Sequence, residues 1–320
     1  MQKIGVLGAG HLGKIHLNCI RNIADYELVG FYDPDDEMAR QTIERFGIKR
    51  FDSIDSLVMA SDVVDIVTPT VAHFACAELA LKSSKHVFIE KPIVATVDEA
   101  QRLVAIADEA RVKVQVGHVE RFNPAFTAAR PFIDNPMFIE THRLAQFNPR
   151  GTDVPVVLDL MIHDIDIILS IVNSNVKRLS ASGVPIVSST PDIANVRLEF
   201  DNGCVANLTA SRLSLKNMRK TRIFQRDSYI SVDFLDKECQ IVEIKDLVGE
   251  PGPFDMILEN EEMKKKLKIY KPEIKPVNAI ETELHEFLRS IEHDTLPPVP
   301  LADGVNALKL AQEILEKMNF

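Results

Sequence analysis

Short apolar runs and helical patterns alternate regularly over the first 118 residues or so. The apolar runs are typical of buried parallel strands and cover 3–7, 27–32, 63–67, 86–89 and 113–116. The stretches between them have helical spacing of apolar residues, over 11–22, 36–46, 73–82 and 97–110. Alternation of this kind predicts a doubly wound parallel sheet that binds its ligand at the carboxyl ends of the strands.

The pattern changes after this region to consecutive extended segments. Helical patterns cover 123–132 and 156–172, and extended segments cover 137–147, 176–186, 194–200, 205–213, 221–224, 229–234 and 239–244. Strands that follow one another without intervening helices indicate a mainly antiparallel or mixed sheet. The Asp201-Asn202-Gly203 sequence between two of them is a hairpin signal.

The rest of the chain is a charged segment followed by two helical patterns. Residues 249–276 contain four prolines and are expected to form a surface excursion, and helices are expected over 279–292 and 303–318. We therefore predict an α/β protein with two domains. An N-terminal Rossmann domain covers 1–120, and a C-terminal α/β domain with a large open mixed or antiparallel sheet covers 121–320.

Composition narrows the possible partners. With 37 basic and 47 acidic residues among 320, the net charge is −10, which argues against nonspecific binding to nucleic acid or anionic membranes. The N-terminus lacks the features of a signal peptide, and no apolar run approaches the ~20 residues of a membrane span. The four cysteines match no metal-ligand spacing. We expect a cytoplasmic protein with free thiols and no bound metal.

The Gly8-Ala9-Gly10-His11-Leu12-Gly13 loop follows the first strand and begins the first helix. In that context Gly8 permits a tight turn, Gly10 lets the backbone approach a pyrophosphate, and Gly13 allows close packing of helix and strand. The N–H groups of His11 and Leu12 are then expected to face the phosphates. These features predict a bound dinucleotide.

Asp33 ends the second predicted strand, 20 residues after Gly13. A carboxylate at this position accepts hydrogen bonds from the ribose hydroxyls and repels a 2′-phosphate, which favours NAD over NADP. The alternative role for Asp33 is to cap the helix that follows.

Candidate acid–base chemistry lies on the predicted helix over 156–172. Asp159, His163 and Asp166 are spaced i, i+4 and i+7 and therefore share one face, whereas Asp164 points elsewhere and is expected to be structural. A carboxylate beside a histidine orients the ring and raises its proton affinity. Two zinc ligands are an alternative reading of this helix, but no cluster of His or Cys supplies the others.

Later strand ends carry three further motifs, Thr68-Pro69-Thr70 with His73, Glu90-Lys91-Pro92, and the helix motif from Asp159 to Asp166. Together with the glycine loop, they resemble the glucose–fructose oxidoreductase / inositol dehydrogenase (Gfo/Idh/MocA) family over essentially the whole chain. The resemblance implies an NAD-dependent oxidoreductase that is a homodimer or homotetramer.

The resemblance also implies site residues. Lys91 matches the active-site lysine of the family, and Asp159 and His163 match its carboxylate and its acid–base histidine. Residues that match the nicotinamide half of the cofactor site are Thr68, Pro69, His73 and Glu90. Lys91 lies at a strand end, where its ammonium can stabilise an alkoxide during oxidation of a secondary alcohol.

The Gly117–Pro124, Arg150–Asp153 and Asn207–Arg212 segments also resemble the subgroup that oxidises the 3-hydroxyl of UDP-N-acetylglucosamine on a route to lipid A. A nucleotide-sugar substrate needs cations for its diphosphate, and Arg binds phosphate oxygens bidentately. Candidate substrate residues are His118, Arg121, Asn123, Arg150, Asp166 and Arg212, and Arg143, Lys216 and Arg219 are further candidate cations.

Two other functions stay open from the sequence. A dehydrogenase of a free polyol such as inositol would need no diphosphate site. A catalytically silent dinucleotide sensor on the same fold would have no need of Lys91, Asp159 and His163.

Overall fold

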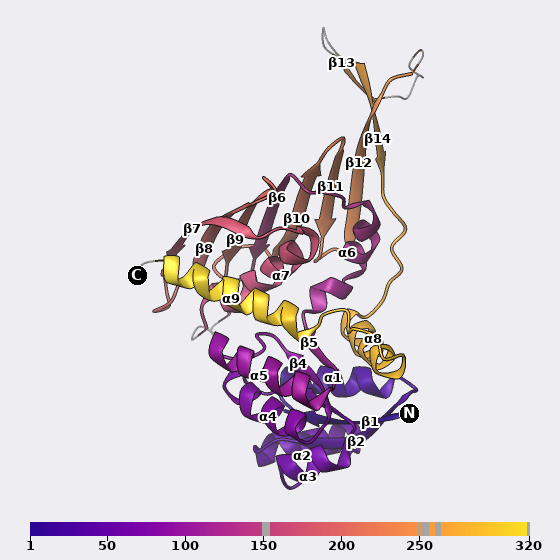
Figure 1. The fold of residues 1–320 in the computed structure, drawn as a ribbon, viewed down its shortest axis with the longest axis vertical. Coiled ribbons are helices and arrows are strands. Elements are labelled where there is room, and N and C mark those ends of the chain that lie inside the picture. The colour runs from indigo at the N-terminus through magenta and orange to yellow at the C-terminus, as the bar shows by residue number, and fades with distance from the viewer. Residues whose placement is uncertain (149–153, 249, 251–255, 260–263, 319–320) are drawn as a thin grey trace. The chain divides into compact units, whose positions relative to one another are not determined.

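The computed structural model describes residues 1–148, 154–248, 250, 256–259 and 264–318, and the chain forms two compact units (Figure 1). The first unit contains Met1–Phe122 and Val277–Lys309. The second contains Asn123–Pro276 and Leu310–Phe320. Each unit has its own sheet.

The sheet of the first unit is parallel throughout. Its strands are β1 (Gln2–Leu7), β2 (Tyr26–Tyr32), β3 (Val63–Ile66), β4 (His86–Glu90) and β5 (Val114–Gly117), in the order β2-β1-β3-β4-β5. The chain runs from β1 to one edge and then returns past β1 to β3, so the strand order reverses between β1 and β3. In doubly wound sheets the ligand binds at this reversal. The predicted Rossmann fold is therefore confirmed.

Helices cover the two faces of this sheet. α1 (His11–Arg21) and α8 (Ala279–Glu292) pack together, and α3 (Ile54–Ala60), α4 (Thr70–Lys82) and α5 (Val97–Ala110) pack in series. Right-handed crossovers place these two groups on opposite faces. Side-chain caps define the start of α2 (Asp36–Phe46), where Asp35 accepts from the Met38 N–H, and of α5, where Thr96 and Glu99 form a capping box.

The return of the chain through α8 corrects the predicted division at residues 120 and 121. Leu284, Phe287 and Leu288 belong to the same buried core as Ile4 of β1. The Phe287 ring lies 6.1 Å from that of Phe88 on β4. Residues 277–309 pack in the first unit because α8 supplies the apolar side chains that cover this face of the sheet.

The second unit contains a nine-stranded mixed sheet, as expected. Its order is β13-β14-β12-β11-β10-β6-β9-β8-β7, with β6 and β9 parallel and the other neighbours antiparallel. The strands are β6 (Phe138–Leu144), β7 (Val176–Val184), β8 (Ile193–Phe200), β9 (Val205–Ser211), β10 (Met218–Gln225), β11 (Ser228–Asp233), β12 (Glu238–Asp246), β13 (Met256–Glu259) and β14 (Lys264–Tyr270). The predicted hairpin joins β8 and β9, where Gly203 has a φ of +87°.

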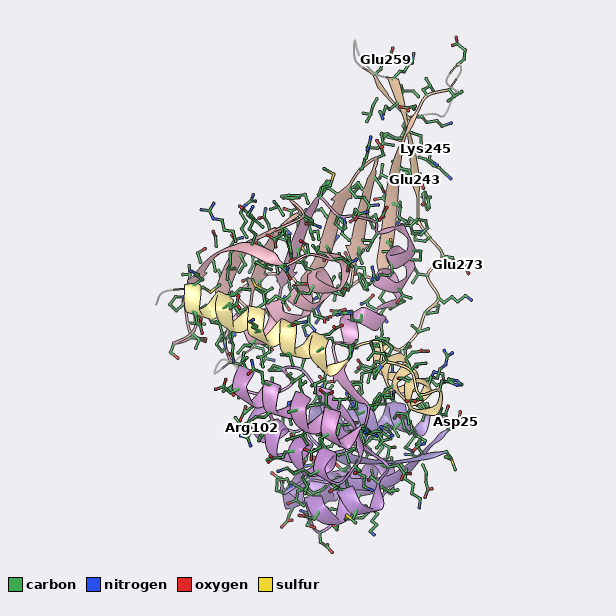
Figure 2. All side chains as sticks on the ribbon, viewed as in Figure 1. Asp25, Arg102, Glu243, Lys245, Glu259 and Glu273 are labelled. Carbon is green, nitrogen blue, oxygen red and sulfur yellow. The ribbon has the colours of Figure 1, made fainter. Side chains whose placement is uncertain are left out.

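The segment predicted as a surface excursion contains two strands, β13 and β14. β13 reads Met-Ile-Leu-Glu and β14 carries four lysines, and all of their side chains are exposed or half-buried. An ion pair of 3.2 Å joins Lys264 of β14 to Glu259 of β13. Figure 2 labels Glu259 on β13, and Glu243 and Lys245 on β12, where an ion pair of 2.8 Å joins these two. β13 is the edge strand of the sheet, and β14 lies between β13 and β12.

Helical segments cover one face of this sheet. α6 (Pro124–Ala129) packs on β11 and β12, and α7 (Ile162–Ile171) packs on β6. A π-helical turn, Val157–Met161, immediately precedes α7 and packs on β9. Short 3-10 turns cover Val119–Phe122, in the first unit, and Arg130–Phe132, in the second. The last helix, α9 (Leu301–Lys317), has residues in both units.

All four cysteines are free thiols and buried. Over the ranges that the structure describes, no helix is both long enough and apolar enough to cross a membrane.

We expect Phe287→Ala to lower the free energy of unfolding by about 3–5 kcal/mol, because it leaves a cavity between α8 and the sheet of the first unit. Leu296→Ala, at a residue that is 75% exposed in the same unit, should change it by less than about 0.5 kcal/mol. Urea unfolding of both variants measures the difference. Equal midpoints would show that α8 is not part of the cooperative core.

Candidate active site

The glycine loop has the three backbone features that the sequence predicts. Gly8 has a φ of +100°, which favours glycine. A Cβ atom on Gly13 would lie 2.1 Å from the Gly8 carbonyl oxygen, so α1 and β1 pack at backbone distance there. A Cβ atom on Gly10 would meet nothing within 4 Å, and Gly10 therefore faces open space. The loop thus combines a tight turn, close packing and an accessible backbone.

The first turn of α1 points its N–H groups toward that open space. Gly10 is the N-cap, and within the described residues no side chain caps the helix. His11 is exposed and Leu12 is half-buried. An uncapped helix N-terminus after a glycine turn attracts phosphate oxygens through its N–H groups and its dipole. The geometry fits the pyrophosphate of a dinucleotide.

Asp33 lies beside the loop at the end of β2. Its Oδ2 accepts a hydrogen bond of 2.7 Å from the Ala9 N–H, and its Oδ1 accepts one of 2.9 Å from the Asp35 N–H. Asp35, not Asp33, is the N-cap of α2, so the alternative role for Asp33 is wrong. The Asp33 carboxylate is thereby oriented at the glycine loop.

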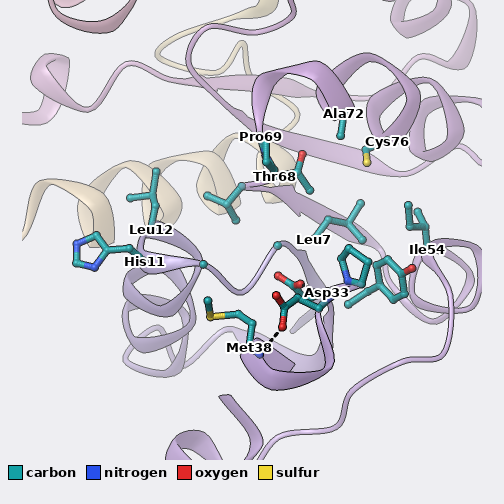
Figure 3. Close-up of a pocket in the computed structure, with 16 residues that line it drawn as sticks. Leu7, His11, Leu12, Asp33, Met38, Ile54, Thr68, Pro69, Ala72 and Cys76 are labelled. Carbon is teal, nitrogen blue, oxygen red and sulfur yellow. Dashed lines mark hydrogen bonds between the residues drawn. The ribbon is translucent and has the colours of Figure 1, made fainter. Parts of the chain in front are cut away.

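A pocket of about 590 Å³ opens at the reversal of strand order (Figure 3). Of the predicted cofactor residues, it is lined by Gly8, Gly10, His11, Leu12, Asp33, Thr68 and Pro69. Figure 3 shows the Asp33 carboxylate beside the glycine loop and Thr68 and Pro69 on the other side of the pocket. Largely apolar walls with two carboxylates, Asp33 and Asp35, suit an adenine base and its ribose.

Sequence reasoning missed several apolar lining residues, which are Tyr32, Met38, Ile54, Ala72 and Cys76. Ile54 belongs to α3, a helix of 7 residues that the apolar pattern did not predict. Its signal was the capping residue Ser53, whose side chain accepts from the Ser56 N–H. A short helix carries too few apolar positions to show a period.

His73 joins two strand-end loops of the first unit. Its Nε2 lies 2.8 Å from the Thr68 carbonyl oxygen, and its Nδ1 lies 2.9 Å from that of Pro92. Burial lowers the pKa of this histidine, against the carbonyl contacts that raise it. His73 therefore acts on the site by holding the loops after β3 and β4 together.

Glu90 is the last residue of β4 and Lys91 follows it, and the two side chains have different environments. The Glu90 carboxylate is buried, and its Oε2 accepts a hydrogen bond of 3.2 Å from the Lys91 N–H. Lys91 is half-buried and precedes Pro92 through a cis peptide bond. Neither residue lines the described pocket, and the Glu90 carboxylate faces His16 of α1 instead.

A π-helical turn interrupts the helix predicted over 156–172 in the second unit. Asp159 lies within the turn and His163 follows it on α7, and both are half-buried. Asp166 is buried and therefore does not share their exposure. Such π-bulges occur frequently at functional sites. The turn presents Asp159 and His163 at the N-terminal end of α7.

Asp164 is structural, as its position on the predicted helix indicates. It accepts two hydrogen bonds from Arg143 of β6, from Nε at 2.9 Å and from a terminal nitrogen at 3.0 Å. Both side chains are buried. The bidentate pair occupies the Arg143 guanidinium and ties α7 to the sheet.

Most candidate substrate residues have contacts within their own unit. Arg121 forms an ion pair of 3.0 Å with Asp303 in the first unit. The Asn123 side chain donates to the Phe234 carbonyl and caps α6. Arg212 donates to the Val154 carbonyl and lies 3.9 Å from Asp192.

The remaining candidates differ in exposure. His118 is buried, whereas Lys216 and Arg219 are exposed. Arg150 lies outside the described residues.

Comparison with known proteins identifies relatives of both units. Residues 2–118 match the family described as an oxidoreductase family with an NAD-binding Rossmann fold, and residues 104–229 match the GFO/IDH/MocA C-terminal domain. The chain is 35% identical over 292 residues to UDP-N-acetylglucosamine 3-dehydrogenase of Acidithiobacillus ferrooxidans, covering 90% of this chain and 88% of that protein.

Two further comparisons give the extent of the likeness. A solved structure of the Acidithiobacillus ferrooxidans enzyme superposes with a TM-score of 0.89 at 32% identity, over 99% of this chain and 97% of that one. A scyllo-inositol 2-dehydrogenase (NAD(+)) of Bacillus subtilis is 29% identical over 231 residues, covering 66% of this chain and 68% of that protein.

Gly10→Ala should fold normally and bind NAD about tenfold or more weakly, because the methyl group enters the space where the backbone meets the pyrophosphate. Gly13→Ala should instead lower the free energy of unfolding by about 1–3 kcal/mol, because its Cβ overlaps the Gly8 carbonyl. Calorimetric NAD titration and urea unfolding separate the two effects. The same pattern of losses in both variants would contradict the separate roles.

Proposed function

Because the chain belongs to the Gfo/Idh/MocA family of NAD-dependent dehydrogenases acting on CH–OH groups, we propose that it oxidises the 3-hydroxyl of UDP-N-acetylglucosamine to a ketone. The observation that carries the substrate is the 35% identity over 90% of the chain with a UDP-N-acetylglucosamine 3-dehydrogenase. The product ketone is the substrate that an aminotransferase needs to make a 3-amino sugar for lipid A.

We propose that the dinucleotide is held by the glycine loop and the strand ends around the pocket. The residues are Gly8, Gly10, His11, Leu12, Gly13, Asp33, Thr68 and Pro69, with His73 holding the loops. Asp33 sets the preference for NAD, because its oriented carboxylate suits ribose hydroxyls and repels a 2′-phosphate. NAD, when bound, accepts the hydride that leaves C3 of the sugar.

The protein must take the hydroxyl proton as the hydride leaves. We assign this proton transfer to Lys91, Asp159 and His163. The Lys91 ammonium stabilises the developing alkoxide, and His163 with the nearby carboxylate of Asp159 accepts the proton. The intact set disfavours the alternative of a silent dinucleotide sensor, since binding alone requires none of the three.

Arg219 of β10 is one candidate cation for the diphosphate. It is the register partner of Arg143 in the pairing of β10 with β6, and directly opposed side chains project from the same face of a sheet. α7 packs on β6, and Asp164 of α7 holds Arg143. Arg219 therefore belongs to the sheet face that carries α7, and its side chain is exposed.

We expect the enzyme to reduce NAD with UDP-N-acetylglucosamine and not with free scyllo-inositol or free N-acetylglucosamine. Absorbance of NADH follows the reaction, with an aminotransferase and an amino donor to remove the ketone. Turnover of the free polyol with no turnover of any UDP-sugar would refute the proposed substrate and favour the polyol alternative.

Arg219→Ala should raise KM for the UDP-sugar about tenfold, because it removes a charged hydrogen bond to the diphosphate. Lys220→Ala is the matched control. Lys220 is the next residue of the strand, so it projects from the other face, where it forms an ion pair of 2.9 Å with Asp233. Similar KM values for both variants would show that Arg219 does not bind the diphosphate.

Lys91→Met and His163→Ala should each lower kcat about 10²- to 10⁴-fold, because Lys91 stabilises the alkoxide and His163 accepts the proton. NAD affinity should stay within about twofold of the wild type. Steady-state kinetics and calorimetric NAD binding test this prediction. Unchanged turnover in either variant would remove that residue from the mechanism.

A further inference from the structure

Four ionisable side chains meet inside the first unit, behind the strand ends of its sheet. They are His16 on α1, Asp65 on β3, Glu90 on β4 and Glu283 on α8, which together we call the buried cluster. His16, Asp65 and Glu283 are 0% exposed, and Glu90 is 7% exposed. Charged side chains are rarely buried this completely, and the cost of burying them calls for a compensating role.

His16 lies between the carboxylates. Its Nδ1 lies 3.0 Å from an oxygen of Asp65, and its Nε2 lies 3.4 Å from Oε1 of Glu90. A carboxylate oxygen of Glu283 lies within 4.8 Å of the facing atoms of His16 and Glu90. The Phe88 ring packs edge-on against His16 at 5.7 Å and keeps this region apolar.

Glu90 connects the buried cluster to Lys91. Its Oε1 faces His16, and its Oε2 accepts the hydrogen bond from the Lys91 N–H. Gly117 on β5 leaves room for the carboxylate, because a Cβ atom there would lie 2.5 Å from Oε1. The position of the Glu90 carboxylate therefore influences the position of the Lys91 backbone.

α8 is anchored so that Glu283 reaches the cluster. Gln115 of β5 donates a hydrogen bond of 2.7 Å to the Glu283 carbonyl oxygen, and Tyr26 of β2 donates one of 3.3 Å to that of Leu284. Phe287, one turn after Glu283, packs on the sheet. Within the described residues, neither carboxylate oxygen of Glu283 has a hydrogen-bond partner.

The charges of the cluster do not balance if every group is ionised. Three carboxylates and one imidazolium would leave a net charge of −2 among side chains removed from water. Burial of uncompensated charge is strongly unfavourable. Retaining a proton among the carboxylates removes part of this cost, and interacting groups then titrate as one unit. Glu283, as the unpartnered carboxyl, is the group that gains most from a proton.

We propose that His16 and Glu283 are positioning residues for the dehydrogenase reaction, with Glu283 as a neutral acid that steadies the Glu90 carboxylate and so the backbone at Lys91. The kinetic part of this proposal rests on the proposed role of Lys91 in proton transfer. The protonation of Glu283 does not depend on that role.

The electrostatic environment agrees with a neutral Glu283. Burial, and then the charge of Glu90, raise the pKa of Glu283 well above its ordinary value. Burial alone would lower the pKa of His16, but the charge and hydrogen bond of Asp65 raise it well above its ordinary value. Two other titratable groups, Cys19 on α1 and Tyr26 on β2, face the cluster, and burial raises both pKa values, so both are neutral.

A raised carboxyl pKa makes a prediction about stability. The folded protein holds the Glu283 proton more tightly than the unfolded chain, so this contribution is complete below the ordinary pKa of a glutamate and declines as pH rises through the folded value. Between about pH 5 and pH 9, the free energy of unfolding of Glu283→Gln should therefore fall less steeply than that of the wild type. Parallel pH profiles would contradict a neutral Glu283.

The kinetic test compares two substitutions at Glu283. Glu283→Ala should lower kcat about 10- to 100-fold with KM for NAD within about twofold, because Lys91 is misplaced while the pyrophosphate loop is intact. Glu283→Gln keeps the shape of the neutral acid and should recover most of this loss. Equal losses in both variants would show that an ionised carboxylate is needed and would overturn the proposal.

Two further variants separate positioning from general damage. Gly117→Ala removes no ionisable group from the buried cluster, but its methyl group displaces the Glu90 carboxylate, so it should reproduce the loss of kcat. Glu286→Gln is the matched control, since Glu286 lies on the same helix and pairs with Arg289 at 3.1 Å on its surface. It should behave as the wild type. Normal kcat in Gly117→Ala would disconnect Glu90 from Lys91.

Infrared difference spectroscopy tests the proton without any substrate. The carbonyl stretch of a protonated carboxylic acid should be present near neutral pH in the wild type and in Glu286→Gln, and absent in Glu283→Gln. Its absence from the wild type overturns the proposal even if turnover is normal. A stoichiometric metal ion found by elemental analysis in the wild type and lost in Glu283→Gln would instead make the cluster a metal site. If no sugar is a substrate, the infrared spectrum still tests whether Glu283 is protonated.

Discussion

The contact between α1 and β1 at Gly13 is the constraint on which the rest of the first unit depends. The helix approaches the Gly8 carbonyl so closely that a side chain on Gly13 would overlap it. This approach opens the loop at Gly10 and aims the first N–H groups of α1 at the same space. His16 lies three residues further on the same face of α1, so the contact also carries the imidazole to Asp65 and Glu90. One packing contact thus places both the phosphate loop and the buried cluster.

α8 shows how a distant segment completes a local site. Residues 277–309 return to the first unit and cover the face of the sheet that α1 leaves open, with Phe287 against Phe88. The same helix brings Glu283 to the cluster beside Glu90. The segment that seals the core thereby also supplies a polar group next to the strand end that carries Lys91. Stability and the placement of Lys91 consequently depend on the same helix.

In the second unit, some polar residues form buried structural pairs and others are partly exposed. The Arg143–Asp164 pair is buried and bidentate and ties α7 to the sheet, whereas Asp159 and His163 are half-buried at the π-helical turn. The π-turn contains Asp159 and shifts its register relative to α7, whereas His163 and Asp166 both lie on α7, where His163 is half-buried and Asp166 is buried. Arg121, Asn123 and Arg212 likewise have contacts within their units, whereas Lys216 and Arg219 are exposed.

The amino-acid sequence by itself determined the parallel sheet, the glycine loop, the position of Asp33 and the succession of strands in the second unit. These features depend on local periodicity and on short-range turn geometry, which neighbouring residues specify. In the helix over 279–292, Glu283 lies four residues before Phe287 and so shares its buried face, which is the sequence signal for a buried carboxyl. Only the tertiary structure decided that this helix belongs to the first unit. It also decided that Arg143 and Arg212 form ion pairs with carboxylates, and that Glu283 lies beside His16 and Glu90. Such pairings join residues far apart in the chain, and the free energy of burying charges together depends on a packing that no local pattern encodes.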